Sequence, residues 1–227
     1  MTSSYPAEAP ADCPLCPRLV AFRRDNEAAY PDWFNGAVPS FAPLASDGGD
    51  ASVELLIVGL APGLQGANRT GRPFTGDWAG DLLYATMLDH GFARGTYDAR
   101  PDDGLTLHRA MITNAVRCVP PQNKPTGAEA SACRPFLAER IASLPSLKVI
   151  MCLGRISHDN TLSALGLKRS ALPFGHNAIH SLPDIGNGLT LIDSYHCSRY
   201  NTNTGRLTTE MFNDVFRSIN EALAGTI

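Results

Sequence analysis

The sequence lacks long apolar runs, internal repeats and low-complexity tracts. No stretch of about eighteen consecutive apolar residues occurs, and the longest such run, near residues 53–60, has the length of a strand. We therefore expect no segment that spans a membrane. The first residues show no basic segment followed by an apolar one, so we find no secretory signal and expect a cytoplasmic location.

An excess of positive charge is also missing. Lys and Arg number 19 against 22 Asp and Glu, so the net charge of −3 gives no overall sign of a nucleic-acid partner. Hydrophobic residues make up 44% of the 227 residues, which is enough to bury a core and excludes wholesale disorder. The length suits one domain over residues 1–227, and we expect a monomer.

Short apolar runs alternate with segments of helical period. The runs predict strands at residues 53–58, 110–115, 148–153 and 189–193, and the intervening segments predict helices near residues 17–27, 80–90, 127–144, 156–165 and 208–223. Strands that are apolar almost throughout are typical of parallel sheets covered by helices on both faces. The pattern predicts a three-layer α/β sandwich, in which ligands bind at the loops that follow the strands.

Four of the six cysteines form a candidate metal site. Cys13 and Cys16 are two residues apart near the N-terminus, whereas Cys118 and Cys133 follow the second predicted strand. Spaced cysteines in a cytosolic chain more often bind metal or react than form disulfides. The wide second spacing departs from the usual zinc pattern and favours an iron–sulfur cluster, although zinc and a metal-free dithiol stay open. Cys152, inside a predicted strand, fits a core residue.

Residues 59–80 contain six glycines after the first predicted strand. The loop lacks both the Gly-Lys-Ser/Thr of a triphosphate site and the Gly-x-Gly-x-x-Gly of a dinucleotide site. Its backbone N–H groups are still suited to an anionic or carbonyl-bearing ligand. Phe74 alone fits a core residue and Asp77 alone fits a helix N-cap, but their clustering favours a binding site. A second polar loop, from His196 to Arg206, follows the last predicted strand and also favours binding.

Together these segments resemble the motifs of the uracil-DNA glycosylase superfamily. The matching segments are Gly59-Leu60-Ala61-Pro62-Gly63 with residues 68–77, Thr113-Asn114-Ala115-Val116-Arg117-Cys118-Val119-Pro120-Pro121, and His196-Cys197-Ser198-Arg199-Tyr200-Asn201. Within the superfamily the chain is most similar to the type B, or family-five, iron–sulfur branch, over about residues 13–223. It departs from sister families at Gly63, where several carry Asp, Glu or Asn, and at Cys197, where Pro is common.

The resemblance implies a four-stranded parallel sheet with flanking helices. It also implies a 4Fe–4S cluster on Cys13, Cys16, Cys118 and Cys133 that pins an N-terminal arm of about residues 1–50. The expected partner is DNA that contains deaminated bases, and the expected reaction hydrolyses the N-glycosidic bond and leaves an abasic site. Uracil is the expected substrate, with hypoxanthine and xanthine also tolerated.

The resemblance, with the chemistry of base excision, assigns roles to the site residues. We expect Asp77 to orient water or support the sugar cation, and His196 to stabilise the departing base anion. Phe74 would stack on the flipped base and Asn114 would read its amide edge. Further base-binding candidates are Gly59, Ala61, Pro62, Gly63 and Asn123. DNA-binding candidates are Asn68, Arg69, Arg72, Ser198, Arg199, Asn201 and Tyr200, the last as a wedge in the duplex.

Two other readings stay open at this point. One is a non-catalytic, metal-stapled module that binds nucleic acid through the same basic loops. The other is an enzyme that acts on free nucleosides.

Overall fold

The computed structural model describes residues 5–226, which form a central five-stranded sheet in the order β4-β1-β5-β7-β6. Four strands run parallel: β1 (Leu55–Gly59), β4 (Ala110–Asn114), β5 (Val149–Leu153) and β7 (Leu189–Ser194). These are the four predicted strands, so the predicted parallel sheet is confirmed.

The predicted count of four strands is one too few. The fifth strand, β6 (Ile179–Leu182), pairs antiparallel with β7 at the edge of the sheet. Its sequence, Ile-His-Ser-Leu, is short and mostly solvent-accessible, so it carries no apolar run. An edge strand of this kind is held by its backbone hydrogen bonds to the neighbouring strand. The local sequence does not predict that pairing.

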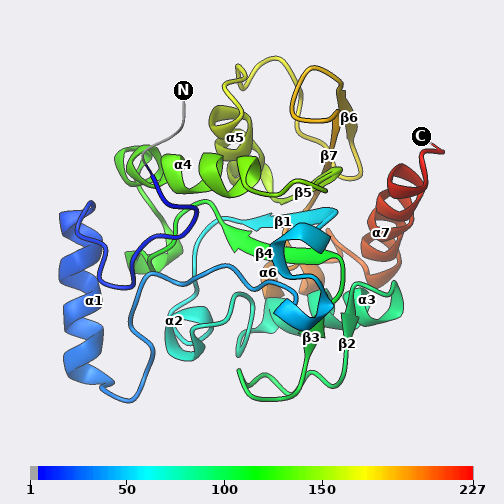
Figure 1. Ribbon diagram of the computed structural model, residues 1–227. Coiled ribbons are helices and arrows are strands. Elements are labelled where there is room, and N and C mark those ends of the chain that lie inside the picture. The colour runs from blue at the N-terminus through cyan, green and yellow to red at the C-terminus, as the bar shows by residue number, and fades with distance from the viewer. Residues whose placement is uncertain (1–4, 227) are drawn as a thin grey trace.

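Helices cover both faces of the sheet, which makes three layers (Figure 1). On one face α3 (Trp78–Asp89) and α7 (Thr209–Ala224) pack against Leu55, Ile57 and their neighbours. On the other face α4 (Gly127–Ala142) and α5 (Arg155–Ala164) pack against Leu56, Val58 and their neighbours. Successive residues of a strand point to opposite faces, so both sets must be apolar, as the sequence pattern requires.

Local capping explains where the helices begin. Thr126 and Glu129 form a capping box at the start of α4, and the Thr208 side chain accepts a hydrogen bond from the backbone N–H of Met211 at the start of α7. The shorter elements are α2 (Ala67–Thr70), α6 (Arg199–Asn203), the 3-10 turns η1 (Ala45–Asp47), η2 (Gly49–Ser52) and η3 (Pro121–Asn123), and a hairpin of β2 (Ala93–Arg94) with β3 (Thr106–Leu107). Within residues 5–226, no helix combines the length and hydrophobicity needed to cross a membrane.

The N-terminal arm packs beside the sheet rather than on it. Its helix α1 (Pro17–Ala29) lies at one edge of the molecule, near the start of α4 (Figure 1). A small apolar cluster joins Leu19 of α1 to Phe136 of α4 and to the cysteines. The arm is also held by charge, because Glu8 pairs with Arg117 at 3.0 Å and with Arg140 at 2.8 Å.

Candidate active site

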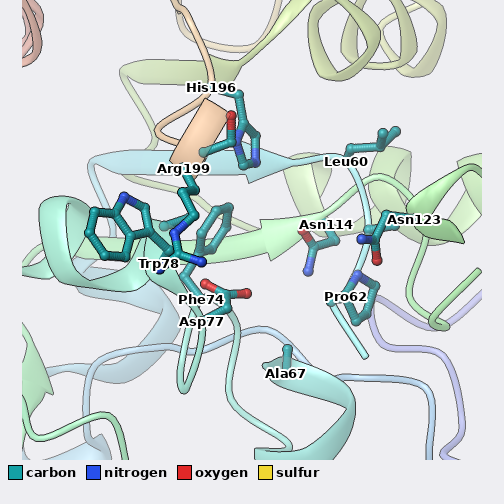
Figure 2. A pocket seen from close by; sticks show the side chains of 14 residues that line it. Leu60, Pro62, Ala67, Phe74, Asp77, Trp78, Asn114, Asn123, His196 and Arg199 are labelled. Carbon is teal, nitrogen blue, oxygen red and sulfur yellow. The ribbon is translucent and has the colours of Figure 1, made fainter. Parts of the chain in front are cut away.

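A pocket of about 350 Å³ opens at the carboxyl edge of the sheet, where β1 and β4 end side by side at Gly59 and Asn114. Asn114 and Asn123 stand on one side of it and Phe74, Asp77, Trp78 and Arg199 on the other, with His196 between the two sides (Figure 2). The rest of the lining comes from Leu60, Ala61, Pro62, Gly63, Ala67, Ala79 and Ser198. The loops predicted to converge therefore do so.

Gly59 lets two of these side chains approach each other. A Cβ atom at this position would collide with Oδ1 of Asn114 and lie 2.8 Å from Cζ of Phe74. Phe74 itself has a φ of 53°, which is unusual for a residue with a side chain. Its backbone is fixed by the Tyr97 hydroxyl, which donates to the Phe74 carbonyl at 3.2 Å. Strain held in this way is characteristic of functional sites.

Asn114 presents an unused polar group to the pocket. The residue is 3% exposed, and among the described residues its Oδ1 atom has no hydrogen-bond partner. Leaving a buried acceptor unpaired costs free energy, so such an atom is most simply explained by a ligand that donates to it. Asn114 is therefore the strongest candidate for recognising a bound group.

The two carboxylate oxygens of Asp77 make different contacts. Oδ1 accepts a hydrogen bond from the backbone N–H of Gly80 and so caps α3, as the N-cap interpretation of the sequence predicts. Oδ2 lies 3.2 Å from the position that a Cβ atom of Gly63 would occupy. Burial raises the pKa of Asp77, against the opposing effect of the Gly80 and Ala79 N–H groups. The carboxylate thus lies against the backbone of both Gly63 and Gly66, and a Cβ atom at Gly66 would collide with it.

His196 lines the pocket as a neutral imidazole. Burial lowers its pKa to about 4, because the charged form loses hydration there. Its ring centroid lies 6.0 Å from that of Phe74. The surrounding loop is fixed on both sides: the Asn201 amide donates to the His196 carbonyl at 2.8 Å, and the buried Cys197 thiol contacts the Ala79 carbonyl at 3.4 Å. At neutral pH this side chain can donate a hydrogen bond but carries no charge.

Two predicted DNA contacts are corrected by the structure. Arg72 is 6% exposed and forms a two-point ion pair with Asp103, at 2.9 and 2.7 Å, while Phe41 and Tyr84 pack against its guanidinium. Asn68 is fully buried and its amide donates to Asn35. Neither side chain is open to a DNA phosphate, so both are withdrawn from the predicted DNA surface. Their partners lie about thirty residues away in the sequence, beyond the reach of a local motif.

The other predicted DNA contacts lie near the mouth of the pocket or at the surface. Arg199 and Ser198 line the pocket, and Ser198 also caps α6. Tyr200 is 71% exposed. Arg69 is exposed and its Nε atom donates to the Gln65 carbonyl. Asn201 has a structural contact, the hydrogen bond to His196 described above.

Sequence reasoning missed Trp78, which lines the pocket and is 46% exposed. The one signal in the sequence that could have identified Trp78 is its position directly after the candidate site residue Asp77. Leu60, Ala67 and Ala79 were missed as well, and nothing in their residue types distinguishes them from core residues.

The four candidate metal ligands line a second, smaller cavity beside α1. Cys13, Cys118 and Cys133 are buried and Cys16 is partly exposed. Two N–H donors face the sulfur atoms: Nη1 of Arg23 lies 3.8 Å from Sγ of Cys118, and the backbone N–H of Arg117 donates to Sγ of Cys133 at 3.3 Å. Within residues 5–226, no three His, Cys, Asp or Glu side chains converge closely enough to hold a single metal ion.

The fold and the pocket define an α/β protein with a pocket that contains polar side chains at the carboxyl edge of its sheet, and comparison with known proteins identifies its family. The profile described as "Uracil DNA glycosylase superfamily" matches residues 46–224. The chain belongs to this superfamily. The Type-5 uracil-DNA glycosylase of Thermus thermophilus is 44% identical over 209 residues, which cover 89% of this chain and 90% of the relative.

Two further relatives carry the same description. The Type-5 uracil-DNA glycosylase of Mycobacterium bovis is 38% identical and covers 94% of this chain and 78% of the relative. That of Pyrobaculum aerophilum is 34% identical and covers 91% of this chain and 87% of the relative. The family resemblance expected from the motifs is confirmed.

Proposed function

We propose that this chain is a DNA-repair uracil-DNA glycosylase. It turns uracil out of DNA, hydrolyses the N-glycosidic bond and leaves an abasic site. The observation that carries the proposal is the convergence of Phe74, Asn114, Asp77 and His196 on one cavity at the carboxyl edge of the sheet. The identity to Type-5 uracil-DNA glycosylases over most of the chain supports it.

Base recognition follows from the unpaired amide of Asn114. A primary amide offers one acceptor and one donor side by side, which match the N3–H donor and the O4 acceptor of uracil. Cytosine presents the opposite pattern at these positions, so it would leave the buried amide unsatisfied. Phe74 supplies the stacking face for the extruded base. A deaminated base in a weakened pair costs less to extrude, which adds to the selectivity.

Bond cleavage places positive charge on the sugar and negative charge on the departing base. Neutral His196 stabilises the base by donating a hydrogen bond to its oxygen, and it does not need to give up a proton. Asp77 acts on the other side of the bond, where its Oδ2 atom faces Gly63 and either holds water or stabilises the sugar cation. In this chain α3 thus supplies the carboxylate that the loop residue at position 63 lacks.

The same pocket admits larger deaminated bases. Its volume of about 350 Å³ leaves room for a bicyclic purine as well as a pyrimidine. Hypoxanthine and xanthine carry the same adjacent N–H and C=O groups as uracil, so Asn114 can pair with them in the same way. We propose both as additional substrates.

The cysteine cavity is proposed to hold a 4Fe–4S cluster. Cys13, Cys16, Cys118 and Cys133 surround a common cavity rather than a point, as ligands of a cluster do because each thiolate binds a different iron. The N–H donors of Arg23 and Arg117 suit thiolate sulfur. When bound, the cluster supplies covalent ties between the N-terminal arm and the segment from β4 to α4. Broad absorbance near 400 nm would support the cluster, and a colourless protein with stoichiometric zinc would overturn it.

We propose that the active form is a monomer, to be checked by sedimentation. The proposed DNA surface comprises Ser198 and Arg199, which line the pocket, and the exposed Arg69 and Tyr200. Arginine and hydroxyl side chains hold phosphates there, and exposed Tyr200 fills the gap left in the duplex.

The activity is tested with oligonucleotides that carry a single uracil, hypoxanthine, xanthine or cytosine at the same position, followed by alkaline cleavage at abasic sites. We expect cleavage at the first three and none at the cytosine control, whose edge does not match Asn114. Binding of the uracil strand without an abasic product would overturn the proposal and leave a non-catalytic binding module. Release of base from free deoxyuridine alone would favour a nucleoside hydrolase.

A further inference from the structure

Trp78 takes no part in the reaction proposed above, yet its side chain lies at the mouth of the pocket (Figure 2). It is the first residue of α3, directly after Asp77, and is 46% exposed. A large aromatic side chain left half in water gives up much of the stabilisation that burial would bring. Its position beside the reacting groups therefore calls for a separate explanation.

The indole is fixed in place by the neighbouring helix α6, on the same side of the pocket. Nε1 of Trp78 donates to the hydroxyl of Thr202 on α6 at 3.0 Å. The guanidinium carbon of Arg199, also on α6, lies 4.9 Å from the centroid of the Trp78 ring. These contacts join residues more than 120 positions apart. The Trp78–Arg199 pair is thus an ordered, flat surface that needs no rearrangement before binding.

The chemistry of this surface suits a nucleobase. The Arg199 guanidinium lies over one face of the indole and adds a positive charge for the connecting phosphate, while the stacked pair still offers a flat outer face to any base. When the pocket holds the extruded base, the strand that carries it must cross the mouth. The next nucleotide of that strand then reaches the Trp78–Arg199 pair. Tyr200, one residue beyond Arg199, stays available for the gap in the duplex.

We propose that the Trp78–Arg199 pair is a stacking subsite for the unpaired nucleobase next to the excised one. The inference rests on the proposed function and extends it to a substrate preference. A neighbour that is already unpaired stacks there without breaking a base pair, so the chain binds uracil in single-stranded or mismatched DNA more tightly than uracil in a fully paired duplex.

Tryptophan fluorescence tests the contact directly, because the chain has two tryptophans. The second, Trp33, stacks on Tyr30 with ring centroids 4.0 Å apart, so Trp33→Phe keeps an aromatic partner there and leaves Trp78 as the single emitter. This variant is titrated with a single-stranded oligonucleotide whose 2′-fluorodeoxyuridine resists cleavage. We expect quenching of Trp78. An otherwise identical strand with abasic neighbours on both sides should bind about tenfold more weakly and quench little.

Substitutions give the complementary measurement. Trp78→Ala should raise the Kd for the strand with intact neighbours about tenfold and leave the Kd for the abasic-neighbour strand unchanged, while Trp78→Phe should restore most of the affinity. Equal quenching and equal affinity for the two strands would overturn the subsite. Equal loss of both affinities in Trp78→Ala, with an unchanged melting temperature, would also overturn it.

Excision by the Trp33→Phe protein from an unmodified uracil strand separates this inference from the proposed function. Excision without any effect of the neighbours overturns only the subsite. Quenching that depends on the neighbours, without excision, supports the subsite and overturns the glycosylase activity.

Discussion

At the scale of single residues, the pocket depends on positions where a side chain is absent as much as on those where one is present. Gly59 lets Phe74 and Asn114 come together, and Gly63 and Gly66 leave room for the Asp77 carboxylate. The proposed reacting groups are therefore placed by close backbone approach. Small changes at these glycines should affect the reaction more than they affect stability.

Gly59→Ala tests this dependence. The added Cβ collides with Oδ1 of Asn114 and the ring of Phe74, so we expect kcat to fall about a hundredfold, the cost typical of misplacing reacting groups by about an ångström. Gly127→Ala is the matched control, since a Cβ there meets no atom within 4 Å. Single-turnover excision and melting temperatures measure both variants. Equal activity of the two would contradict the assigned geometry.

Asp77→Asn separates catalysis from folding, because Asn caps a helix as well as Asp does. We expect turnover to fall about a hundredfold or more while DNA affinity stays near its original value, since the carboxylate acts on the cation that forms during cleavage. Asp77→Ala additionally loses the helix cap and should melt at a lower temperature. Parallel losses of turnover and affinity in Asp77→Asn would argue against a catalytic carboxylate.

The pH dependence adds a second readout for Asp77. Burial raises its pKa, and the carboxylate must be ionised to act. The excision rate of the original protein should therefore fall as the pH is lowered through a value above that of an exposed aspartate. The Asp77→Asn variant should lack this component of the acid limb, and an unchanged profile would assign it to another group.

At the scale of elements, the sequence predicted those helices and strands that are determined by interactions between residues close together in the chain. Apolar runs predicted the parallel strands, and the helical period predicted α4, which begins where Thr126 and Glu129 form a capping box. The positions of β6 and of Arg72 were not predictable in this way. The strand β6 depends on pairing with β7, and Arg72 is turned inward by Asp103, 31 residues away. The sequence of a glycine-rich loop does not show whether its arginine binds a phosphate or a buried carboxylate.

A buried histidine links α5 to β7, the strand that leads to His196. Nδ1 of His158 lies 2.8 Å from Asp193 and Nε2 lies 3.0 Å from the carbonyl of Leu172. Both neighbours are acceptors, so the arrangement favours the imidazolium form, which donates from both ring nitrogens. Burial alone would lower the pKa of His158, but the hydrogen bond and charge of Asp193, with the Leu172 carbonyl, outweigh it and raise the pKa.

This raised pKa predicts how stability changes with pH. A group whose folded pKa exceeds its unfolded value stabilises the fold fully below the unfolded value, about 6.5 for histidine, and loses that contribution as the pH rises through the folded value. We expect the free energy of unfolding to drop by about 1–3 kcal/mol above pH 6.5. Urea denaturation at several pH values measures it. His158→Gln should be less stable at pH 6 and lack this drop, and parallel curves for the two proteins would contradict the prediction.

At the scale of the whole molecule, the N-terminal arm is joined to the α/β body by the cysteine cavity and by two sets of ion pairs. The cavity is lined by the four cysteines and joins α1 to the segment from β4 to α4. Glu8 pairs with Arg117 and Arg140, and Arg18 of α1 pairs with Glu129 of α4 at 2.7 Å. Arg117 connects Glu8 to the cavity, because its side chain holds Glu8 and its backbone N–H faces Cys133. The proposed catalytic pocket lies outside these attachments.

Removing the proposed cluster should therefore loosen the arm without unfolding the body. After oxidative removal of iron with a chelator present, hydrogen exchange should speed up in α1 and stay slow in β1, β5 and β7, because the sheet core contains none of the four cysteines. Excision activity should persist in part. Uniform loss of protection across the sheet would show instead that the cluster is needed for the whole fold.

Glu8→Gln should make the arm depend more strongly on the cluster, with the Arg18–Glu129 pair as its remaining ion pair to α4. The buried Arg117 would lose its charged partner, which costs about 1.5–3 kcal/mol, as is typical of a hydrogen bond to a charged group. With iron present, α1 should remain protected from exchange. Without iron, the variant should exchange α1 amides faster than the original protein does. Glu27→Gln, an exposed charge on α1, is the control and should match the original protein in both states. If Glu8→Gln and Glu27→Gln behave alike after iron removal, the ion pairs of Glu8 do not help to hold the arm.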